Sequence, residues 1–372
     1  MSTGLSRRSF LRFAAAGSAG FALPLVHEGG LAWAQGMPAK PPPGADVVMI
    51  NSNENPLGPC EAARKALADI IPQGGRYLFP MADELVETFA SMHGLKPEHV
   101  LAYAGSSEPL QYAVLAFTSP RHSVVTANPT YEAAWEAAEL NGARSHKVPL
   151  KADFAHDVHA MAKADPAAGL LYVCNPNNPT GTTTPRADIE WLLAHKPKGS
   201  VVMVDEAYIG FSDEPSVLDL VAAGKDLIVL RTFSKIYGMA GIRCGFAAAR
   251  PDLIKRLAPY GSNPMPVTAT AAAIASLKDT AVLPERKRVN AEVRGETFAW
   301  LEANRFKFNR SASNCFMIDC GRPGKEVIAA MQERGVYIGR TWAVWPNQVR
   351  ITVGTQAEMD RFKRAFQDVM KA

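Results

Sequence analysis

The sequence predicts an α/β protein, with a large domain built on a mostly parallel sheet flanked by helices and a smaller α+β domain. Two observations lead to this prediction. The 372 residues exceed the length at which one core usually stops growing, roughly 250–300 residues, so two domains are expected. From about Tyr77 to Tyr260, short apolar runs also alternate with stretches of helical periodicity, which is typical of a sheet covered by helices.

The strand candidates of the large domain are short runs that are apolar at nearly every position, as in parallel strands covered on both faces. They are Val124–Thr126, Leu170–Val173, Val201–Val204 and Leu227–Leu230. Helical periodicity fills the intervals, for example at Glu132–Leu140 and Ala187–Ala194. Ligand groups of such sheets lie at the carboxyl ends of the strands. We therefore expect functional residues directly after these runs.

The C-terminal part predicts the smaller α+β domain. A long helical stretch at 268–303 precedes two strand candidates and two helices, namely Cys315–Asp319, Val349–Val353, Gly324–Glu333 and Ala357–Met370. The expected organisation is a signal segment at 1–34, a connector and arm at 35–76, the large domain at 77–262 and the small domain at 263–372. We expect the residues before Tyr77 to join the small domain or to reach a partner subunit.

Composition and charge describe an ordinary globular protein. Hydrophobic residues make up 47% of the chain and charged residues 20%. The formal net charge is +4, and the first 34 residues contribute +2 of it through Arg7, Arg8, Arg12 and Glu28. So small a charge excludes a nucleic-acid or anionic membrane surface as the expected partner. The five cysteines form no close metal-type pair, which favours buried free thiols over a metal site or a disulfide framework.

The N-terminus resembles a twin-arginine export signal. Arg7 and Arg8 precede a weakly apolar stretch, and a small-x-small cleavage site follows near Ala34. Because glycines and a proline interrupt the stretch, and a bilayer span needs about 20 apolar residues, we expect no stable membrane span. We expect a periplasmic or otherwise exported protein, carried by the twin-arginine translocase. An uncleaved anchor or a chance basic start is the alternative.

Four polar segments follow predicted strands at points where core packing does not explain them. They are Asn175–Gly181, Asp205–Tyr208, Thr232–Lys235 and Gly241–Phe246. A carboxylate, a lysine and an arginine converging on one crevice predict a site for a cofactor that carries an anionic group.

Taken together, these segments resemble the fold-type I pyridoxal-phosphate-dependent aminotransferases of class I/II, in particular the histidinol-phosphate aminotransferase-like branch. The resemblance runs from about Asn51 to the C-terminus, and the motifs occur in the family's order and spacing. It implies the fold-type I architecture, pyridoxal 5'-phosphate as cofactor, amino acid and 2-oxo acid substrates, and a homodimer with a shared active site.

The resemblance also assigns roles around the cofactor ring. Lys235 matches the lysine that forms a Schiff base with the cofactor aldehyde and then acts as general acid and base. Asp205 matches the carboxylate that stabilises the protonated pyridine nitrogen. Tyr208 and Asn178 resemble the donors to the ring's 3-oxygen, and Tyr131 resembles the aromatic that stacks on the ring. A helix cap for Asp205, core packing for the tyrosines and turn formation for Asn178 are the structural alternatives.

A second group resembles the ligands of the cofactor phosphate. A helix N-terminus and an arginine both suit a phosphate group, and the matching residues are Gly105, Ser106, Ser107, Ser234 and Arg243. The family often has an acidic residue where Ser107 stands. Tyr77 resembles the tyrosine that reaches the neighbouring subunit's phosphate, although the family's Arg-Tyr-Pro-Asp is here Arg-Tyr-Leu-Phe-Pro. Loop capping, structural hydrogen bonds and surface exposure are the alternatives.

For the substrate, Arg350 matches the arginine that binds the α-carboxylate. Arg340 stands where this branch often has an arginine that contacts a distal phosphate, and Asn53 belongs to a segment over the site. Trp342 and Trp345 suggest a pocket for aromatic or imidazole-bearing amino acids, or alternatively the packing of a domain interface.

The predicted reaction is transamination between an L-amino acid and a 2-oxo acid. The alternative is a decarboxylase or lyase on the same scaffold, because the same cofactor supports cleavage of other bonds at the α carbon. A non-catalytic regulator is disfavoured, since no DNA-binding helix pair precedes the domain. Because histidinol phosphate biosynthesis is cytosolic, an exported member is expected to act on another substrate.

Overall fold

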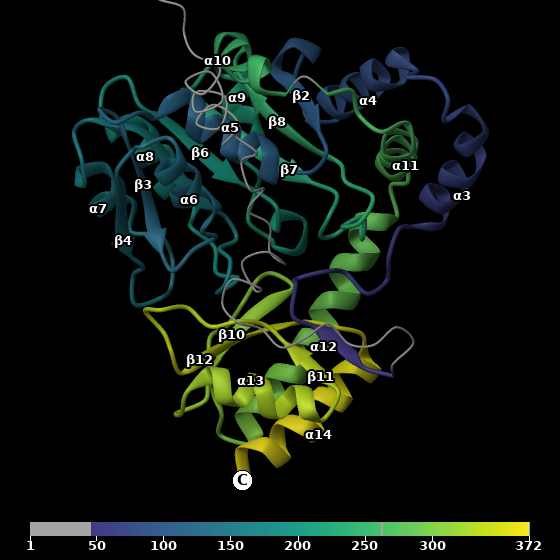
Figure 1. Ribbon diagram of the computed structural model, residues 1–372, viewed down its shortest axis with the longest axis vertical. Coiled ribbons are helices and arrows are strands. Elements are labelled where there is room, and N and C mark those ends of the chain that lie inside the picture. Colours follow the sequence, from purple (N-terminus) through teal and green to yellow (C-terminus); the bar gives the residue numbers. More distant parts are fainter. Residues whose placement is uncertain (1–45, 262, 372) are drawn as a thin grey trace, which may run out of the picture.

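The computed structural model describes residues 46–261 and 263–371, and it consists of a large and a small domain. Figure 1 shows the large domain in the upper half, with helices on both faces of its sheet, and the small domain below. Within the described ranges, no helix is long and apolar enough to cross a membrane. The predicted signal segment lies outside the described residues.

The large domain is organised around a seven-stranded sheet of order β2-β8-β7-β6-β5-β3-β4. Five neighbouring strands, from β7 to β4, run parallel, whereas β8 is antiparallel to both β7 and β2. The bounds are β2 Val100–Tyr103, β3 Ser123–Asn128, β4 Ser145–Pro149, β5 Ala168–Cys174, β6 Val201–Asp205, β7 Leu227–Thr232 and β8 Gly245–Ala249. The four predicted strands and the mostly parallel sheet are confirmed.

Two apolar cores cover the two faces of this sheet. In β5 the side chains of Leu171 and Val173 belong to one core, and those of Leu170 and Tyr172 belong to the other. This alternation follows from the two-residue period of a strand. The helices that cover the faces and edges are α3 Glu61–Ile70, η1 Ile71–Gln73, α4 Phe79–Met92, η2 Pro97–His99, α5 Ser107–Phe117, α6 Ala133–Leu140, α7 Val158–Lys163, α8 Arg186–His195, η3 Ile209–Phe211, α9 Leu218–Ala222, α10 Pro251–Leu257, η4 Ala258–Tyr260 and α11 Val267–Lys278.

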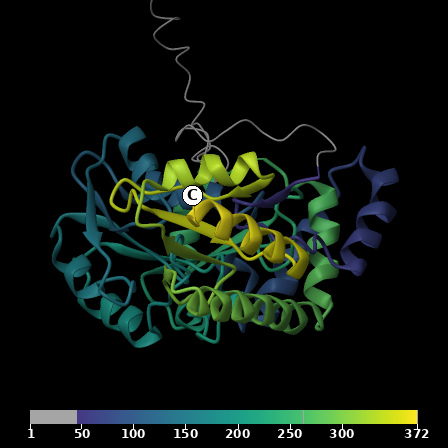
Figure 2. The ribbon, with the colours of Figure 1, turned by 90° about the horizontal axis from the view of Figure 1, so that it is seen from below.

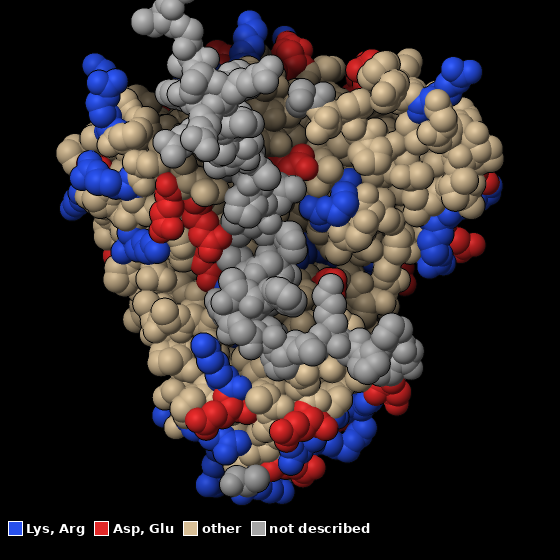
Figure 3. All heavy atoms as spheres, in the orientation of Figure 1, with Lys and Arg blue, Asp and Glu red and all other residues tan. Residues whose placement is uncertain are grey.

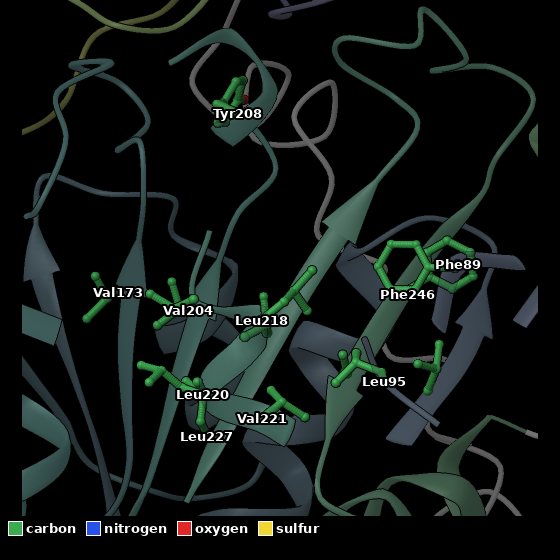
Figure 4. Packing of buried hydrophobic residues seen from close by; sticks show 14 of the residues in the cluster. Phe89, Leu95, Val173, Val204, Tyr208, Leu218, Leu220, Val221, Leu227 and Phe246 are labelled. Carbon is green, nitrogen blue, oxygen red and sulfur yellow. The ribbon is translucent and has the colours of Figure 1, made fainter. Parts of the chain in front are cut away.

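Figure 4 shows the first of these cores, in which the rings of Phe89 and Phe246 stack with centroids 4.1 Å apart. In the same view Tyr208 lies beyond Val204, past the carboxyl end of β6. The core therefore fixes the strand, and the segment after the strand carries the polar groups.

The small domain has its own core around two short sheets. One sheet has the order β12-β10-β9 and is antiparallel, and the other is a parallel pair of β1 and β11. Figure 2 views this end of the molecule, with α14 in yellow. The bounds are β1 Val48–Ile50, α12 Val282–Ala303, β9 Lys307–Phe308, β10 Cys315–Asp319, α13 Gly324–Glu333, β11 Val336–Ile338, β12 Gln348–Thr352 and α14 Gln356–Lys371. The predicted β10 and α13 are confirmed at both ends.

Two expectations about domain organisation differ from the structure. The helical stretch at 268–303 is two helices, since α11 ends at Lys278 and α12 begins at Val282, with Pro284 in its first turn. A proline there removes no intrahelical hydrogen bond, so it suits a new helix start. The helix α11 also packs against α3 and α4, and therefore belongs with the large domain rather than with 263–372. The strand β1 joins the small domain by pairing with β11, which is one of the two arrangements expected for the residues before Tyr77.

Charged side chains are distributed without a strong bias on the visible face. In the lower part of Figure 3, over the small domain, acidic and basic side chains are intermixed. All five cysteines are free, and four of them are buried, as the sequence predicts.

Candidate active site

The polar segments predicted at strand ends meet at one edge of the large sheet. Asp205 is the last residue of β6, and Asn178 and Lys235 follow the neighbouring strands β5 and β7. A cavity of about 550 Å³ lies there. Nine of the predicted site residues line it: Ser106, Ser107, Tyr131, Asn178, Asp205, Tyr208, Ser234, Lys235 and Arg243.

Asp205 is a buried carboxylate whose hydrogen bonds come from neutral groups. The hydroxyl of Tyr172 donates to one carboxylate oxygen over 3.1 Å, and the backbone N–H of Ala207 donates to the other over 3.1 Å. Burial raises the pKa of the Asp205 carboxyl to about 6, although both hydrogen bonds and the positive charge of Lys235 oppose the rise. A cation placed against this carboxylate would lower its pKa again, so the position fits the protonated nitrogen of a pyridine ring.

Lys235 carries its amine into the same cavity. Its Nζ donates to the backbone oxygen of Ser52 over 3.3 Å and lies 5.4 Å from the centre of the Tyr208 ring. Tyr208 is in turn held from the N-terminal segment, because the side-chain amide of Asn53 donates to its hydroxyl over 3.1 Å. The amine therefore lies between the N-terminal segment and the strand ends.

The predicted phosphate ligands form a cradle beside the start of α5. Arg243 donates to the hydroxyl of Ser234 over 3.1 Å and to the backbone oxygen of Ala240 over 2.9 Å. Gly105 has a φ of +104°, and a Cβ at this position would lie 2.1 Å from a guanidinium nitrogen of Arg243. Only glycine fits both the backbone angle and the close approach. Ser106 occupies the N-cap position of α5, so the cradle combines a cation, a hydroxyl and a helix N-terminus, which are groups that bind phosphate.

Arg350 is completely buried at the junction of the two domains. It extends from β12 of the small domain and donates to the side-chain oxygen of Asn178 over 2.9 Å and to the backbone oxygen of Asn51 over 2.6 Å. Arg350 is therefore not a solvated surface arginine. These contacts hold the guanidinium beside Asn178, which lines the cavity.

Arg340, expected as a ligand of a distal phosphate, is paired with an acidic side chain of the protein in this structure. Its guanidinium is buried and donates two hydrogen bonds, of 2.7 and 2.6 Å, to the carboxylate of Glu132. It also lies 4.2 Å from the centre of the Trp342 ring. Trp342 is buried, and Trp345 packs its ring edge-on against Phe154. Among the described residues that line the cavity, neither tryptophan is present.

Tyr77 lies apart from the cavity lining in this chain. Its side chain is 69% exposed and its ring stacks on that of Phe79 at 5.4 Å. The structure therefore brings together the predicted ring and phosphate residues of one chain, but it does not bring Tyr77 to them.

Sequence reasoning missed two side chains that hold the predicted residues in place. Tyr172 donates to Asp205, and Glu132 pairs with Arg340. A signal for Tyr172 was present, because it is a hydroxyl-bearing side chain within the otherwise aliphatic run of β5. For Glu132, the adjacent Tyr131 was noted, but the partner lies 208 residues away in the sequence.

Comparisons with known proteins agree with this geometry. The sequence profile of the family aminotransferase class I and II matches residues 45–366. The chain is 34% identical over 342 residues to a histidinol-phosphate aminotransferase of Moorella thermoacetica, covering 87% of this chain and 86% of that protein. It is also 35% identical over 328 residues to one of Symbiobacterium thermophilum, covering 86% and 90% of the two chains.

Solved structures show the same similarity. A putative histidinol-phosphate aminotransferase from Erwinia carotovora atroseptica superposes with a TM-score of 0.84 at 32% identity, covering 88% of this chain and 96% of that one. One from Sinorhizobium meliloti, in complex with pyridoxal-5'-phosphate, has a TM-score of 0.81 at 25% identity and covers 99% of both chains. Since the profile spans most of the chain and relatives exceed 30% identity, this protein belongs to the aminotransferase class I and II family and is a pyridoxal-phosphate-dependent aminotransferase.

Proposed function

We propose that Lys235 is the residue that binds pyridoxal phosphate and moves the proton in transamination between an L-amino acid and a 2-oxo acid. One observation carries this assignment: the amine of Lys235 and the buried carboxylate of Asp205 reach the same cavity of about 550 Å³ from neighbouring strand ends. When bound, the cofactor supplies an aldehyde that combines with amines and a ring that withdraws electrons from the α carbon.

The surrounding residues have separate roles in this proposal. Asp205 stabilises a protonated ring nitrogen, and Tyr208 and Asn178 donate to the ring oxygen. Ser106, Ser107, Ser234 and Arg243, with the backbone of Gly105, hold the phosphate, and Tyr131 stacks on the ring. With cofactor and substrate bound, the Nζ of Lys235 would take a proton from the substrate α carbon and later return one.

Arg350 binds the substrate α-carboxylate in this proposal, and Asn53 orders the segment above the site. The buried arginine suits an α-carboxylate, because a guanidinium can hold one through charge-assisted hydrogen bonds. The alternative raised by the sequence, a decarboxylase or lyase on the same scaffold, is distinguished from transamination by its products.

The two reactions differ in what an amino acid alone does to the purified enzyme. Transamination predicts that the cofactor absorbance changes to that of the aminated form, that one equivalent of oxo acid is released, and that 2-oxoglutarate reverses the change. Release of carbon dioxide or ammonia without this conversion would favour the decarboxylase or lyase.

We propose that aromatic or imidazole-bearing amino acids are preferred donors. The support is Trp342, whose ring centre lies 5.6 Å from the guanidinium carbon of Arg350, the residue proposed to bind the substrate carboxylate. A panel of amino donors tested with 2-oxoglutarate provides the measurement. Equal activity with alanine, aspartate and phenylalanine would contradict this preference.

We also propose a homodimer in which Tyr77 reaches the partner's cofactor phosphate. The support is that Tyr77 and the neighbouring Phe79 are large apolar side chains exposed at 69% and 60%. Light scattering is expected to give twice the chain mass. Tyr77→Phe is expected to weaken cofactor binding several-fold without dissociating the dimer, and a monomer with full activity would reject the proposal.

Export by the twin-arginine route is a further proposal, which rests on the sequence motif containing Arg7 and Arg8. Replacing both arginines with lysine is expected to retain the enzyme in the cytoplasmic fraction with its activity intact. Unchanged periplasmic recovery would rule out this route.

A further inference from the structure

Arg340 lies near the proposed substrate site, and its counter-ion is the carboxylate of Glu132 in the same protein. Both oxygens of Glu132 accept hydrogen bonds from Arg340, at 2.7 and 2.6 Å, and both side chains are at least nine-tenths buried. Glu132 lies at the start of α6 in the large domain, whereas Arg340 follows β11 in the small domain.

This pair lies directly beside the arginine proposed to bind the substrate carboxylate. The guanidinium carbons of Arg340 and Arg350 lie 4.2 and 5.6 Å from the centre of the same Trp342 ring. The backbone N–H of Arg350 also donates to the backbone oxygen of Arg340 over 3.3 Å. On the other side, Glu132 follows Tyr131, which lines the cavity.

The charges of this cluster determine which anion it suits. Glu132 contributes one negative charge, and Arg340 and Arg350 contribute two positive charges, so these three side chains sum to +1. The sum of +1 over these three side chains matches a carboxylate better than a phosphate monoester, which carries nearly two negative charges.

We propose that Glu132 is a specificity-determining residue: it sets the anion site for amino donors with a singly charged carboxylate and discriminates against donors with a phosphate monoester in that position. The inference rests on the proposed transamination at this site. A phosphate monoester would recruit both arginines only by displacing Glu132, and an unpaired carboxylate left in a buried position is strongly unfavourable.

Donors that share a side chain and differ only in the anion provide the test. L-Phenylalanine is compared with phenylalaninol phosphate, and L-histidine with histidinol phosphate, each with 2-oxoglutarate as acceptor. The unmodified enzyme is expected to show a higher kcat/KM for the carboxylate of each pair. If it prefers the phosphate monoesters, the inference fails, whether or not any variant folds.

The variant Glu132→Gln keeps hydrogen-bonding capacity and removes the charge. We expect the ratio of kcat/KM for phosphate over carboxylate to rise about tenfold or more, mainly through KM, because one positive charge becomes available to the donor. Both donors are measured on the same preparation, so partial unfolding cancels in the ratio. An unchanged ratio would overturn the inference and leave Glu132 as a structural link between the domains.

Two further variants complete the design. Glu139→Gln removes an exposed acid from the same helix and is expected to leave the ratio unchanged. Adding Arg340→Gln to Glu132→Gln is expected to abolish the gain, because the released cation is then gone. Absence of amino transfer from every donor would contradict the proposed function, whereas transfer that favours the phosphates contradicts only this inference.

Discussion

Asp205 and Glu206 are adjacent in the sequence, but their side chains lie in two different regions of the molecule, the cavity and the protein interior. Asp205 faces the cavity and accepts hydrogen bonds from a tyrosine hydroxyl and a backbone N–H. Glu206 is equally buried but accepts from the hydroxyl of Ser216 over 2.6 Å, from the N–H of Val217 over 2.7 Å and from Arg231 over 3.2 Å.

The difference shows how burial alone fails to identify a functional acid. Glu206 has a cation within hydrogen-bonding distance, so its charge is compensated inside the fold. The hydrogen bonds to Asp205 come from neutral groups, and its raised pKa records a site that suits an additional cation. Substitutions in the two environments are expected to affect activity and stability differently.

The largest effect is expected at Lys235, which lines the cavity together with Asp205. Lys235→Ala should lower kcat by about 10⁴-fold, equivalent to about 5.5 kcal/mol, because both the covalent attachment and the proton transfer are lost. Borohydride reduction should trap no adduct at this position. The exposed Lys225→Ala serves as control and should retain full activity. A trapped adduct at the normal site of Lys235→Ala would refute the assignment.

A smaller effect is expected in cofactor-free protein, where the ionisation of Asp205 should change the free energy of unfolding by about 3 kcal/mol. The folded-state pKa of about 6 lies above the unfolded value, so the native state binds more protons between these two values. The contribution is therefore fully present below about pH 4 and is lost as pH rises to about 6. Asp205→Asn should remove this part of the pH dependence, measured as the difference between urea unfolding curves of the two proteins. A constant difference from pH 4 to 7 would contradict it.

On the structural side, Glu206→Gln is expected to lower the free energy of unfolding by about 2 kcal/mol. The amide keeps a hydrogen bond but leaves Arg231, which is only 16% exposed, without its counter-charge. Chemical denaturation provides the measurement, and kcat of the folded fraction should change little. The exposed pair of Glu190 and Arg186 is the control, where Glu190→Gln should cost less than about 0.5 kcal/mol. A large loss of kcat would place Glu206 in the site after all.

The smallest effect is expected for Tyr172→Phe, which should change the free energy of ionising Asp205 by about 1 kcal/mol. Burial holds the pKa of Tyr172 well above its ordinary value, so its hydroxyl stays protonated and donates to Asp205. Removing this donor should raise the pKa of Asp205 further and shift the pH dependence of the cofactor absorbance by less than about one unit. An unchanged pH profile would limit Tyr172 to packing.

Much of the fold followed from local patterns. The strand β10 and the helix α13 agree with their predicted bounds. As expected, Asn178, Asp205 and Lys235 lie at or just after the ends of three adjacent strands. Local pattern did not indicate the antiparallel direction of β8, because an apolar run does not encode the direction of its neighbour. Nor did it separate α11 from the small domain, because helical periodicity does not identify which surface a helix covers.

The sequence alone determined the family, the reaction class and the residue types at the strand ends, because those depend on motifs read in order along the chain. Only the tertiary structure decided how charges are paired. Glu132 and Arg340 are 208 residues apart, and Asp205 and Glu206 are neighbours with different partners. A carboxylate or guanidinium acquires its role from the groups that folding brings within hydrogen-bonding distance, and sequence proximity does not report those groups.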